Sequence, residues 1–429
     1  MENYRKDMLK TLLEVLKFDG EQGCGGVGAP FGKGNRECLD YMLRLCESLG
    51  MSVKNLDGYA GFADIGEGEA FGILGHLDTV PVSDGWTKNP YGEIDDGIIY
   101  GRGVLDDRGP MVACVYALKA LLDEGLKPKR KIRFIFGCNE ESGWECIDHY
   151  RKHEQMPEEG FSPDADFPVI NCEKGIATLA YTKEYDGKIS LSGGTRPNVV
   201  PSECNAVLPM TDENLKAVIE GRLDYEIKDN KIYATAHGKA AHAANPQLGE
   251  NAIVKMLKAL RKTDKDFDEL YNAFSSFDGS GCGLDLCDEI SGALTLNLGL
   301  VDCDASLSFI LNIRYPVTVT ETQIINILDN CIPCYIVAYS VFQPPLFVDK
   351  DDDLVKTLLK TYNDVTGQNA EAVTIGGGTY ARALKKGVAF GPEFPGKLST
   401  IHMPDERVSI DDFMTMAKIY YTAIKSLCF

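Results

Sequence analysis

The chain has 429 residues, a length that predicts two or three domains. Apolar residues make up 44% and charged residues 25%, which excludes a disordered or fibrous chain. The formal net charge is −20, and an acidic surface repels both nucleic acid and anionic membranes, so we expect neither as a partner.

The first twenty residues predict an amphipathic helix. Leu9, Leu12, Leu13 and Leu16 recur at helical spacing, and no uninterrupted apolar stretch of the kind found in a signal peptide occurs there. The chain also has no run of 18 apolar residues. We therefore expect a cytoplasmic protein.

A strand–helix–strand pattern follows. Apolar strands are predicted at Phe71–Leu74 and Lys131–Gly137, and a helix at Met111–Asp123 with Pro110 at its first position. This order predicts an α/β domain with a largely parallel sheet.

The pattern changes at about Tyr185, where strand-like runs separated by turn residues alternate with short helices. After Pro344 a helix is predicted from Asp352 to Val365, and a last helix begins at Ser409, with Asp412 as its capping partner. We therefore expect a discontinuous α/β domain, residues 1–184 and 344–429, interrupted by an inserted α+β domain, residues 185–343.

Polar residues cluster at the junctions of the predicted α/β elements. His76 and Asp78 follow the first strand, and this spacing supplies a possible metal ligand together with a group that orients it. Asp106 lies in a glycine-rich turn before the helix. Taken singly, each of these features is also common in proteins without a metal.

The second strand is followed by Glu140 and Glu141, whose side chains should diverge, so that one can bind metal while the other faces the reacting water. Further carboxylates occur at Asp164 and Asp166, and His402 precedes the last helix. Imidazole and carboxylate donors without thiolate suit Zn²⁺, with Mn²⁺ or Co²⁺ as substitutes.

These motifs, in this order, resemble a known family. GHLDTVP, YGRGVLDDRGP, the Glu-Glu pair, PDADFPVI and the C-terminal histidine are similar to the dizinc peptidases and amidohydrolases of peptidase family M20, which includes acetylornithine deacetylase, succinyl-diaminopimelate desuccinylase and carnosinase. GWTKNPYG, GGGTYAR and VAFGPEFPG resemble the PepV-like dipeptidase branch. The resemblance implies a zinc-peptidase (phosphorylase/hydrolase-like) catalytic domain with an inserted α+β lid domain.

The resemblance also implies a role for each motif residue in a centre with two Zn²⁺ per chain. It assigns His76 and Asp164 to one zinc, Glu141 and His402 to the second, Asp106 to a bridge between them, Asp78 to the orientation of His76, and Glu140 to general-base catalysis. Asp166 competes with Asp164 for the ligand position. A cis peptide is expected between Asp106 and Asp107.

The inserted domain carries further resemblances. His242 resembles the lid histidine that reaches the substrate carbonyl. Asn198, Arg314 and the loop of Gly376, Gly377 and Gly378 are expected to hold the C-terminal carboxylate of the substrate, and Thr379 and Arg382 are further expected substrate-binding residues. Two positions depart from the family pattern, with Arg108 replacing a lysine and Asp405 replacing an asparagine.

The implied activity is hydrolysis of the peptide bond of dipeptides by a zinc-bridging hydroxide, with broad specificity that includes Xaa-His or β-Ala dipeptides. Two alternatives stay open: an N-acyl-amino-acid amidohydrolase of the same family, and a non-catalytic peptide-binding module. A small peptide is the expected partner. We expect a functional monomer whose lid serves its own active site, although a dimer is not excluded by the sequence.

Overall fold

The computed structural model describes residues 1–429 and divides them into two units. Unit 1 comprises Met1–Asn171, Phe347–Val373 and Thr379–Phe429, and unit 2 comprises Cys172–Leu346 and Thr374–Gly378. Unit 1 is thus discontinuous in sequence, and unit 2 is inserted into it.

The first boundary lies earlier than the expected residue 184. Strand β10 (Gly175–Glu184) pairs along its whole length with β18 (Ser306–Tyr315), which belongs to unit 2. These ladder hydrogen bonds place the strand in the inserted unit rather than in the first domain.

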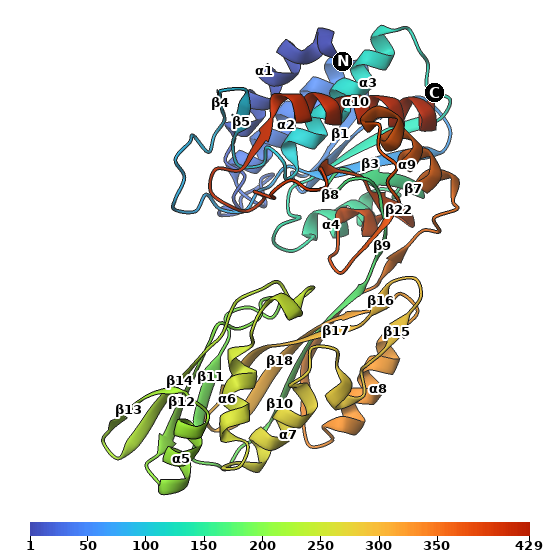
Figure 1. Cartoon of the computed structure of the whole chain (residues 1–429). Helices are drawn as coiled ribbons and strands as arrows, with labels where there is room; N and C mark the ends of the chain where they lie inside the picture. The colour runs from blue at the N-terminus through green and yellow to red at the C-terminus, as the bar shows by residue number, and fades with distance from the viewer. The chain divides into compact units, whose positions relative to one another are not determined.

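Unit 1 is an α/β unit built on a mixed sheet. The strand order is β1-β2-β6-β3-β7-β22-β9, in which β6, β3, β7 and β22 run parallel to one another and β2 runs antiparallel to both of its neighbours, β1 and β6. Helices α3 and α10 lie on one side of the sheet and α4 on the other (Figure 1).

The helices of unit 1 are α1 (Arg5–Leu16), α2 (Lys33–Ser48), α3 (Arg108–Asp123), α4 (Glu145–His153), α9 (Asp353–Thr366) and α10 (Ile410–Cys428). The strands of this unit and of its crossings to unit 2 are β1 (Ser52–Leu56), β2 (Ala60–Ile65), β3 (Ala70–His76), β4 (Glu93–Asp95), β5 (Ile98–Tyr100), β6 (Lys131–Gly137), β7 (Glu159–Ser162), β8 (Ala165–Asp166), β9 (Ile170–Glu173), β20 (Leu346–Phe347), β21 (Val373–Ile375), β22 (Lys386–Ala389), β23 (Pro392–Glu393) and β24 (Arg407–Ser409).

The predicted helix ends are confirmed at one site and wrong at another. Ser409 caps α10, because its hydroxyl accepts a hydrogen bond from the backbone N–H of Asp412 at 3.0 Å. Helix α3 begins at Arg108, so Pro110 is its third residue rather than its first. Proline is tolerated there because the N–H groups of the first turn have no partner within the helix.

Unit 2 is an α+β unit with an antiparallel sheet of eight strands in the order β13-β14-β12-β11-β17-β18-β10-β19. Its helices lie over one face of the sheet (Figure 1), and β14 alternates buried and exposed residues, as expected for a strand covered on one side. The remaining strands and helices are β11 (Ser190–Gly193), β12 (Glu203–Pro209), β13 (Asp224–Lys228), β14 (Lys231–His237), β15 (Cys287–Asp288), β16 (Gly292–Ala293), β17 (Thr295–Cys303), β19 (Ile336–Gln343), α5 (Asp212–Glu220), α6 (Ala252–Leu260), α7 (Lys265–Phe274) and α8 (Glu321–Cys331).

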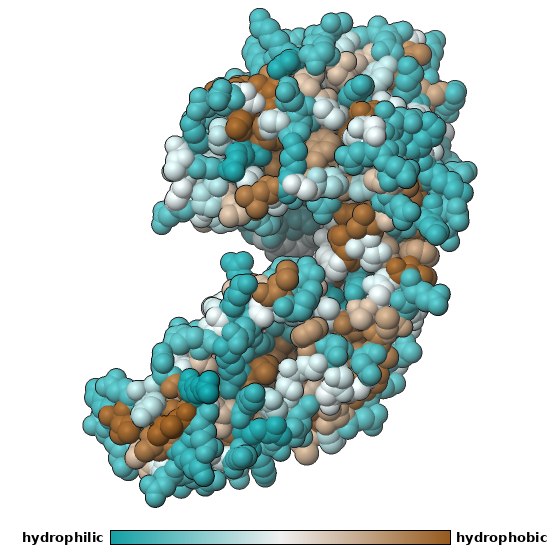
Figure 2. Space-filling model, viewed as in Figure 1, coloured by the Kyte–Doolittle hydropathy of each residue, from teal (hydrophilic) through white to brown (hydrophobic).

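The surface is mostly hydrophilic, with small apolar patches (Figure 2). One patch lies at the edge strand β13, where Tyr225, Ile227 and the neighbouring Tyr233 of β14 are exposed. No helix has both the length and the apolar character needed to cross a membrane.

Candidate metal centre and active site

Three neighbouring parallel strands end at the candidate centre. His76 is the last residue of β3, Glu140 and Glu141 follow β6, and Asp164 follows β7. Because β6, β3 and β7 are parallel neighbours, their carboxyl ends meet at one edge of the sheet. This edge is where open α/β sheets place their binding sites.

The glycine-rich turn before α3 brings Asp106 to the same edge. Gly103 has φ +87°, a left-handed conformation that favours glycine. A Cβ atom on Gly109 would lie 2.0 Å from the carbonyl oxygen of Val104, so the turn closes too tightly for a side chain. The peptide bond between Asp106 and Asp107 is cis, as expected.

The carboxylate of Asp106 lies between two imidazoles. Its Oδ1 is 2.8 Å from Nε2 of His76, and its Oδ2 is 2.8 Å from Nε2 of His402. His402 Nε2 also lies 3.0 Å from Oε1 of Glu141. His76 is completely buried, whereas 49% of the His402 side chain is exposed, so the centre opens to solvent on the His402 side.

Asp164 and Glu140 lie on the His76 side of the centre. Asp164 Oδ2 is 3.7 Å from His76 Nε2, and donor atoms of His76, Glu140 and Asp164 all lie within 4.8 Å of one another. Asp166 belongs to no such group, so the geometry favours Asp164 of the two candidates. The adjacent Glu140 and Glu141 therefore diverge, one toward Asp164 and the other toward His402.

Carboxyl groups outnumber imidazoles at the centre. Burial and the neighbouring Asp164 raise the pKa of Glu140 well above its usual value, and burial also raises the pKa of Asp164. Burial alone would raise the pKa of Asp106 as well, but hydrogen bonds with His402 and His76 hold it far below normal. Burial would lower the pKa of His402, but its hydrogen bonds to Asp106 and Glu141 raise it to about 10. Buried carboxylates in such an excess favour a bound cation.

This donor set fits divalent metal ions. Two imidazoles and several carboxylates, without thiolate, are the ligands of zinc and manganese centres in hydrolases. Donor atoms of His76, Glu140 and Asp164 lie within 4.8 Å of one another, and so do those of His76, Asp106 and Glu141, while His402 lies 2.8 Å from the other oxygen of Asp106. The chain therefore contains a candidate centre for two metal ions.

Asp78 lies against His76 and also supports the two glutamates. Nδ1 of His76 lies 3.0 Å from the backbone carbonyl oxygen of Asp78 and 3.5 Å from its carboxylate. The carboxylate also accepts hydrogen bonds from the backbone N–H groups of Glu140, at 3.0 Å, and Glu141, at 3.1 Å. The shorter contact to His76 thus comes from the backbone of Asp78, while the side chain both lies near the ring and holds the segment that carries the two glutamates.

Four residues that the sequence analysis missed support the centre. Trp144 Nε1 donates to Oε1 of Glu140 at 3.0 Å, and the Tyr380 ring meets that of His76 edge to face. Arg102 forms a buried 2.7 Å ion pair with Glu406. Glu406 also accepts hydrogen bonds from backbone N–H groups of the turn that holds Asp106. Only the hydrogen bond between Trp144 and Glu140 had a signal in the sequence, because Trp144 lies four residues after Glu140.

The two departures from the family pattern lie outside the donor set. The Arg108 side chain is buried, and its guanidinium donates to the backbone carbonyls of Leu77 and Phe18, both at 2.7 Å. Asp405 accepts hydrogen bonds from the backbone N–H groups of Thr87, at 2.8 Å, and Lys88, at 2.9 Å. Both residues therefore stabilise loops.

Unit 2 brings four of its predicted residues together. An isolated β-bridge joins Val199 to His242, and the N–H of Ala243 donates to the carbonyl of Asn198 at 2.9 Å. Arg314 donates to the carbonyl of Gly376 at 2.9 Å. Desolvation and the nearby Arg314 charge lower the pKa of His242, so its imidazole is neutral at neutral pH.

The loop from Gly376 to Arg382 is divided between the units. Gly376, Gly377 and Gly378 belong to unit 2, whereas Thr379 and Arg382 belong to unit 1. The Thr379 hydroxyl caps the short helix Tyr380–Ala383 by accepting from the N–H of Ala381 at 3.2 Å. Thr379 thus has a local structural role in unit 1.

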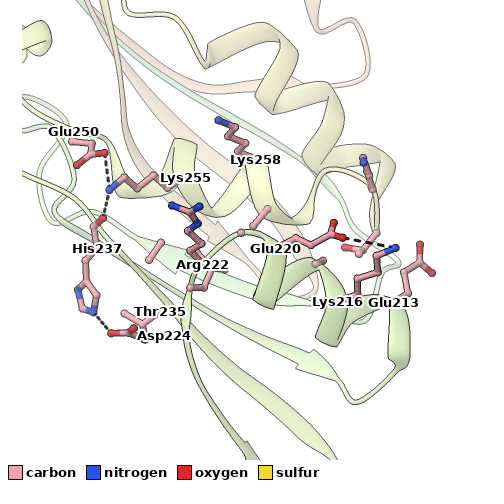
Figure 3. Close-up of a pocket in the computed structure, with 17 residues that line it drawn as sticks. Glu213, Lys216, Glu220, Arg222, Asp224, Thr235, His237, Glu250, Lys255 and Lys258 are labelled. Atoms are coloured by element: carbon pink, nitrogen blue, oxygen red, sulfur yellow. Dashed lines mark hydrogen bonds and ion pairs between the residues drawn. The ribbon is translucent and has the colours of Figure 1, made fainter.

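A pocket of about 860 Å³ in unit 2 contains none of the predicted site residues (Figure 3). Its charged groups largely neutralise one another. Lys255 contacts Glu250 at 2.7 Å, and His237 contacts Asp224 at 3.2 Å (Figure 3). This pocket offers no converging catalytic groups comparable to those of the candidate centre.

A carboxylate between two histidines, at the edge of a largely parallel sheet where such folds bind ligands, is the arrangement expected of a metal-dependent hydrolase. The family model of peptidase family M20/M25/M40 matches residues 72–426, so the chain belongs to this family and is a metallopeptidase.

The chain is also similar along its whole length to individual proteins. A Bacillus subtilis (strain 168) protein named "Putative dipeptidase YtjP" is 38% identical over 452 residues, covering 99% of this chain and 97% of the relative. Two solved structures share the fold. Aminoacylhistidine dipeptidase from Vibrio alginolyticus has a TM-score of 0.61 at 14% identity, covering 98% of this chain and 96% of that one. The M20 family metallo-carboxypeptidase Sso-CP2 from Sulfolobus solfataricus has a TM-score of 0.60 at 16% identity, covering 98% of both chains.

Proposed function

We propose that this protein is a dizinc dipeptidase whose catalytic centre lies in unit 1. The observation that carries the proposal is the Asp106 carboxylate, which has one oxygen 2.8 Å from each of two imidazoles, while Glu140 and Asp164 group with one of them, that of His76. His76 and Asp164 would hold one ion, and His402 and Glu141 the other. The relative named for dipeptidase activity, 38% identical along the chain, supports the substrate class.

Glu140 is the proposed general base. Bound zinc would polarise the scissile carbonyl and lower the pKa of the attacking water. Glu140 accepts the proton of that water and transfers it to the leaving amine. Trp144 holds one oxygen of this carboxylate, and Asp78 holds its backbone, so the base is positioned from two directions.

Unit 2 supplies the proposed substrate-binding residues. His242 would donate a hydrogen bond to the oxyanion, and the buried Arg314, with Asn198, the glycines at 376–378, Thr379 and Arg382, would bind the C-terminal carboxylate. A buried guanidinium favours substrates with a free carboxylate nearby over blocked ones.

The charge around the centre favours a dipeptide over an N-acyl amino acid. Asp166 and Glu393 are paired residues of the neighbouring strands β8 and β23, and the pKa of Glu393 is raised by burial and by the charges of Asp166 and Asp106. When ionised, the carboxylates of Asp166 and Glu393 would attract the free ammonium group of a dipeptide. An acylated amine has no such charge.

A substrate panel with a matched variant tests the proposal. Zinc-loaded protein is assayed with Ala-Ala, β-Ala-His, a tripeptide and an N-acetyl amino acid. Free dipeptides should be hydrolysed fastest, and Glu140→Gln should lower kcat by about 10²–10⁴-fold while retaining zinc. Faster turnover of the N-acetyl substrate would instead identify an amidohydrolase, and zinc binding without turnover of any substrate would identify a binding module.

The predicted functional monomer has a separate test. A Glu140→Ala chain is mixed with a His242→Ala chain, each inactive alone. If each chain needs only its own residues, the mixture stays inactive. Restored activity would show that these residues act between chains.

A further inference from the structure

A second cluster of metal-binding side chains lies outside the candidate centre. His149 and His153 are four residues apart on α4, which places both imidazoles on one face of the helix. Asp57, in the turn between β1 and β2, lies beside them, with its Oδ2 3.2 Å from Nε2 of His149. One donor atom from each of the three residues falls within 4.8 Å of the others.

Contacts around the cluster orient the two rings. Nδ1 of His153 lies 2.9 Å from the backbone carbonyl oxygen of His149, so Nδ1 donates a hydrogen bond and Nε2 carries the lone pair. A backbone carbonyl in this position is a common partner of a metal-bound histidine. The His149 ring stacks on Tyr59, with centroids 4.1 Å apart and planes at 7°, and on the His153 ring at 4.2 Å. These contacts already restrict the rotamers of the two histidine side chains, so metal binding would cost less side-chain entropy.

We propose that Asp57, His149 and His153 form a binding site for a transition-metal dication such as Zn²⁺. Two imidazoles and one carboxylate match the donors that zinc prefers, and they leave positions for water. Calcium and magnesium are disfavoured because they require mainly oxygen ligands. The Asp57 side chain is 74% exposed, so an ion can enter from solvent. The acidic surface of the chain, at net charge −20, attracts cations to it.

The simpler interpretation is a histidine–aspartate hydrogen bond without a metal. The chain offers a matched example in His237, whose Nε2 lies 3.2 Å from Oδ2 of Asp224, the same separation as in the His149–Asp57 pair. His237 appears in none of the candidate metal-binding groups. His237→Ala therefore removes a similar pair without removing a three-donor cluster.

Zinc counting on the full-length protein tests the site. Wild type, His149→Ala, His153→Ala, Asp57→Asn and His237→Ala are dialysed against a series of buffered free Zn²⁺ concentrations, and zinc per chain is measured by mass spectrometry. His149→Ala and His153→Ala should bind one ion fewer than wild type and His237→Ala. Asp57→Asn should require about tenfold or more free Zn²⁺ to bind that ion. Dipeptide turnover of the zinc-loaded variants should stay unchanged.

The measurement is a difference between proteins, so it does not depend on how many ions the catalytic centre binds. If loss of the Tyr59 contact unfolds His149→Ala, the exposed Asp57→Asn substitution decides the question, because it leaves that contact in place. Equal zinc binding by wild type and the folded variants at every free Zn²⁺ concentration would overturn the proposal. Loss of an ion only in His237→Ala would do the same.

Discussion

Replacing Asp78 separates two roles that this residue could have. Its carboxylate accepts hydrogen bonds from the N–H groups of Glu140, at 3.0 Å, and Glu141, at 3.1 Å, whereas the partner of His76 Nδ1 is the backbone carbonyl of Asp78. A substitution of the side chain therefore removes the support of the two glutamates and keeps the hydrogen bond that orients His76.

The expected magnitude follows from these bonds. A hydrogen bond to a charged group contributes about 1.5–3 kcal/mol, so Asp78→Ala should lower the free energy of unfolding by about 3–6 kcal/mol. Asp78→Asn keeps one acceptor oxygen and should cost about half as much. A displacement of about 1 Å in a catalytic group can reduce the rate about 10²-fold, so kcat should fall by at least this factor in both variants.

The assay combines urea unfolding, zinc affinity and dipeptide kinetics. Zinc affinity should change by only a few-fold, because the ligands and the backbone partner of His76 remain. Asp352→Ala is the control, since it removes the capping hydrogen bond from the Leu354 N–H and a 2.7 Å ion pair with Lys386, neither of which involves a residue of the centre, and should cost about 1–2 kcal/mol without changing kcat. A 10–100-fold loss of zinc affinity in Asp78→Asn, with normal kcat at saturating zinc, would refute the reasoning and assign the carboxylate to His76.

Three further predictions concern the surroundings of the centre. The pKa of His402 in the metal-free protein is about 10, so its imidazole is protonated at pH 8 and must lose that proton to bind metal. Zinc binding in weak buffer should therefore release at least one proton per chain, and His402→Ala should release fewer protons than wild type. Zinc binding without proton release would contradict this prediction. Arg102→Met leaves the Glu406 carboxylate buried without its partner at 2.7 Å. The free energy of unfolding, measured by urea titration, should fall by about 3–5 kcal/mol. A change below about 1 kcal/mol would show that this ion pair does not stabilise the fold. Glu393→Gln should raise KM for Ala-Ala and leave KM for an N-acetyl amino acid unchanged; an equal effect on both substrates would remove the ammonium preference.

The sequence by itself predicted the main elements around the centre. Strands β3 and β6, helix α3 and the Ser409 cap follow from local patterns of apolar spacing, turn glycines and capping residues, which depend only on neighbours in the chain. The order of the motifs also predicted the family to which the chain belongs. Helices α2 and α4 were missed, because their mixed polar sequences become helical against the sheet edge formed by β1 and β2 rather than by local signal alone.

Only the tertiary structure decided how the predicted residues meet. The strand order β6-β3-β7 places residues up to 88 positions apart, His76 and Asp164, at one edge, and neither this order nor the resulting 2.8 Å contacts of Asp106 can be read from spacing. The same holds for the Asp78 carboxylate, which binds N–H groups 62 and 63 residues away in addition to its 3.5 Å contact with the nearby His76. Motifs identify which chemical groups are present, whereas long-range backbone geometry determines which donor each acceptor reaches.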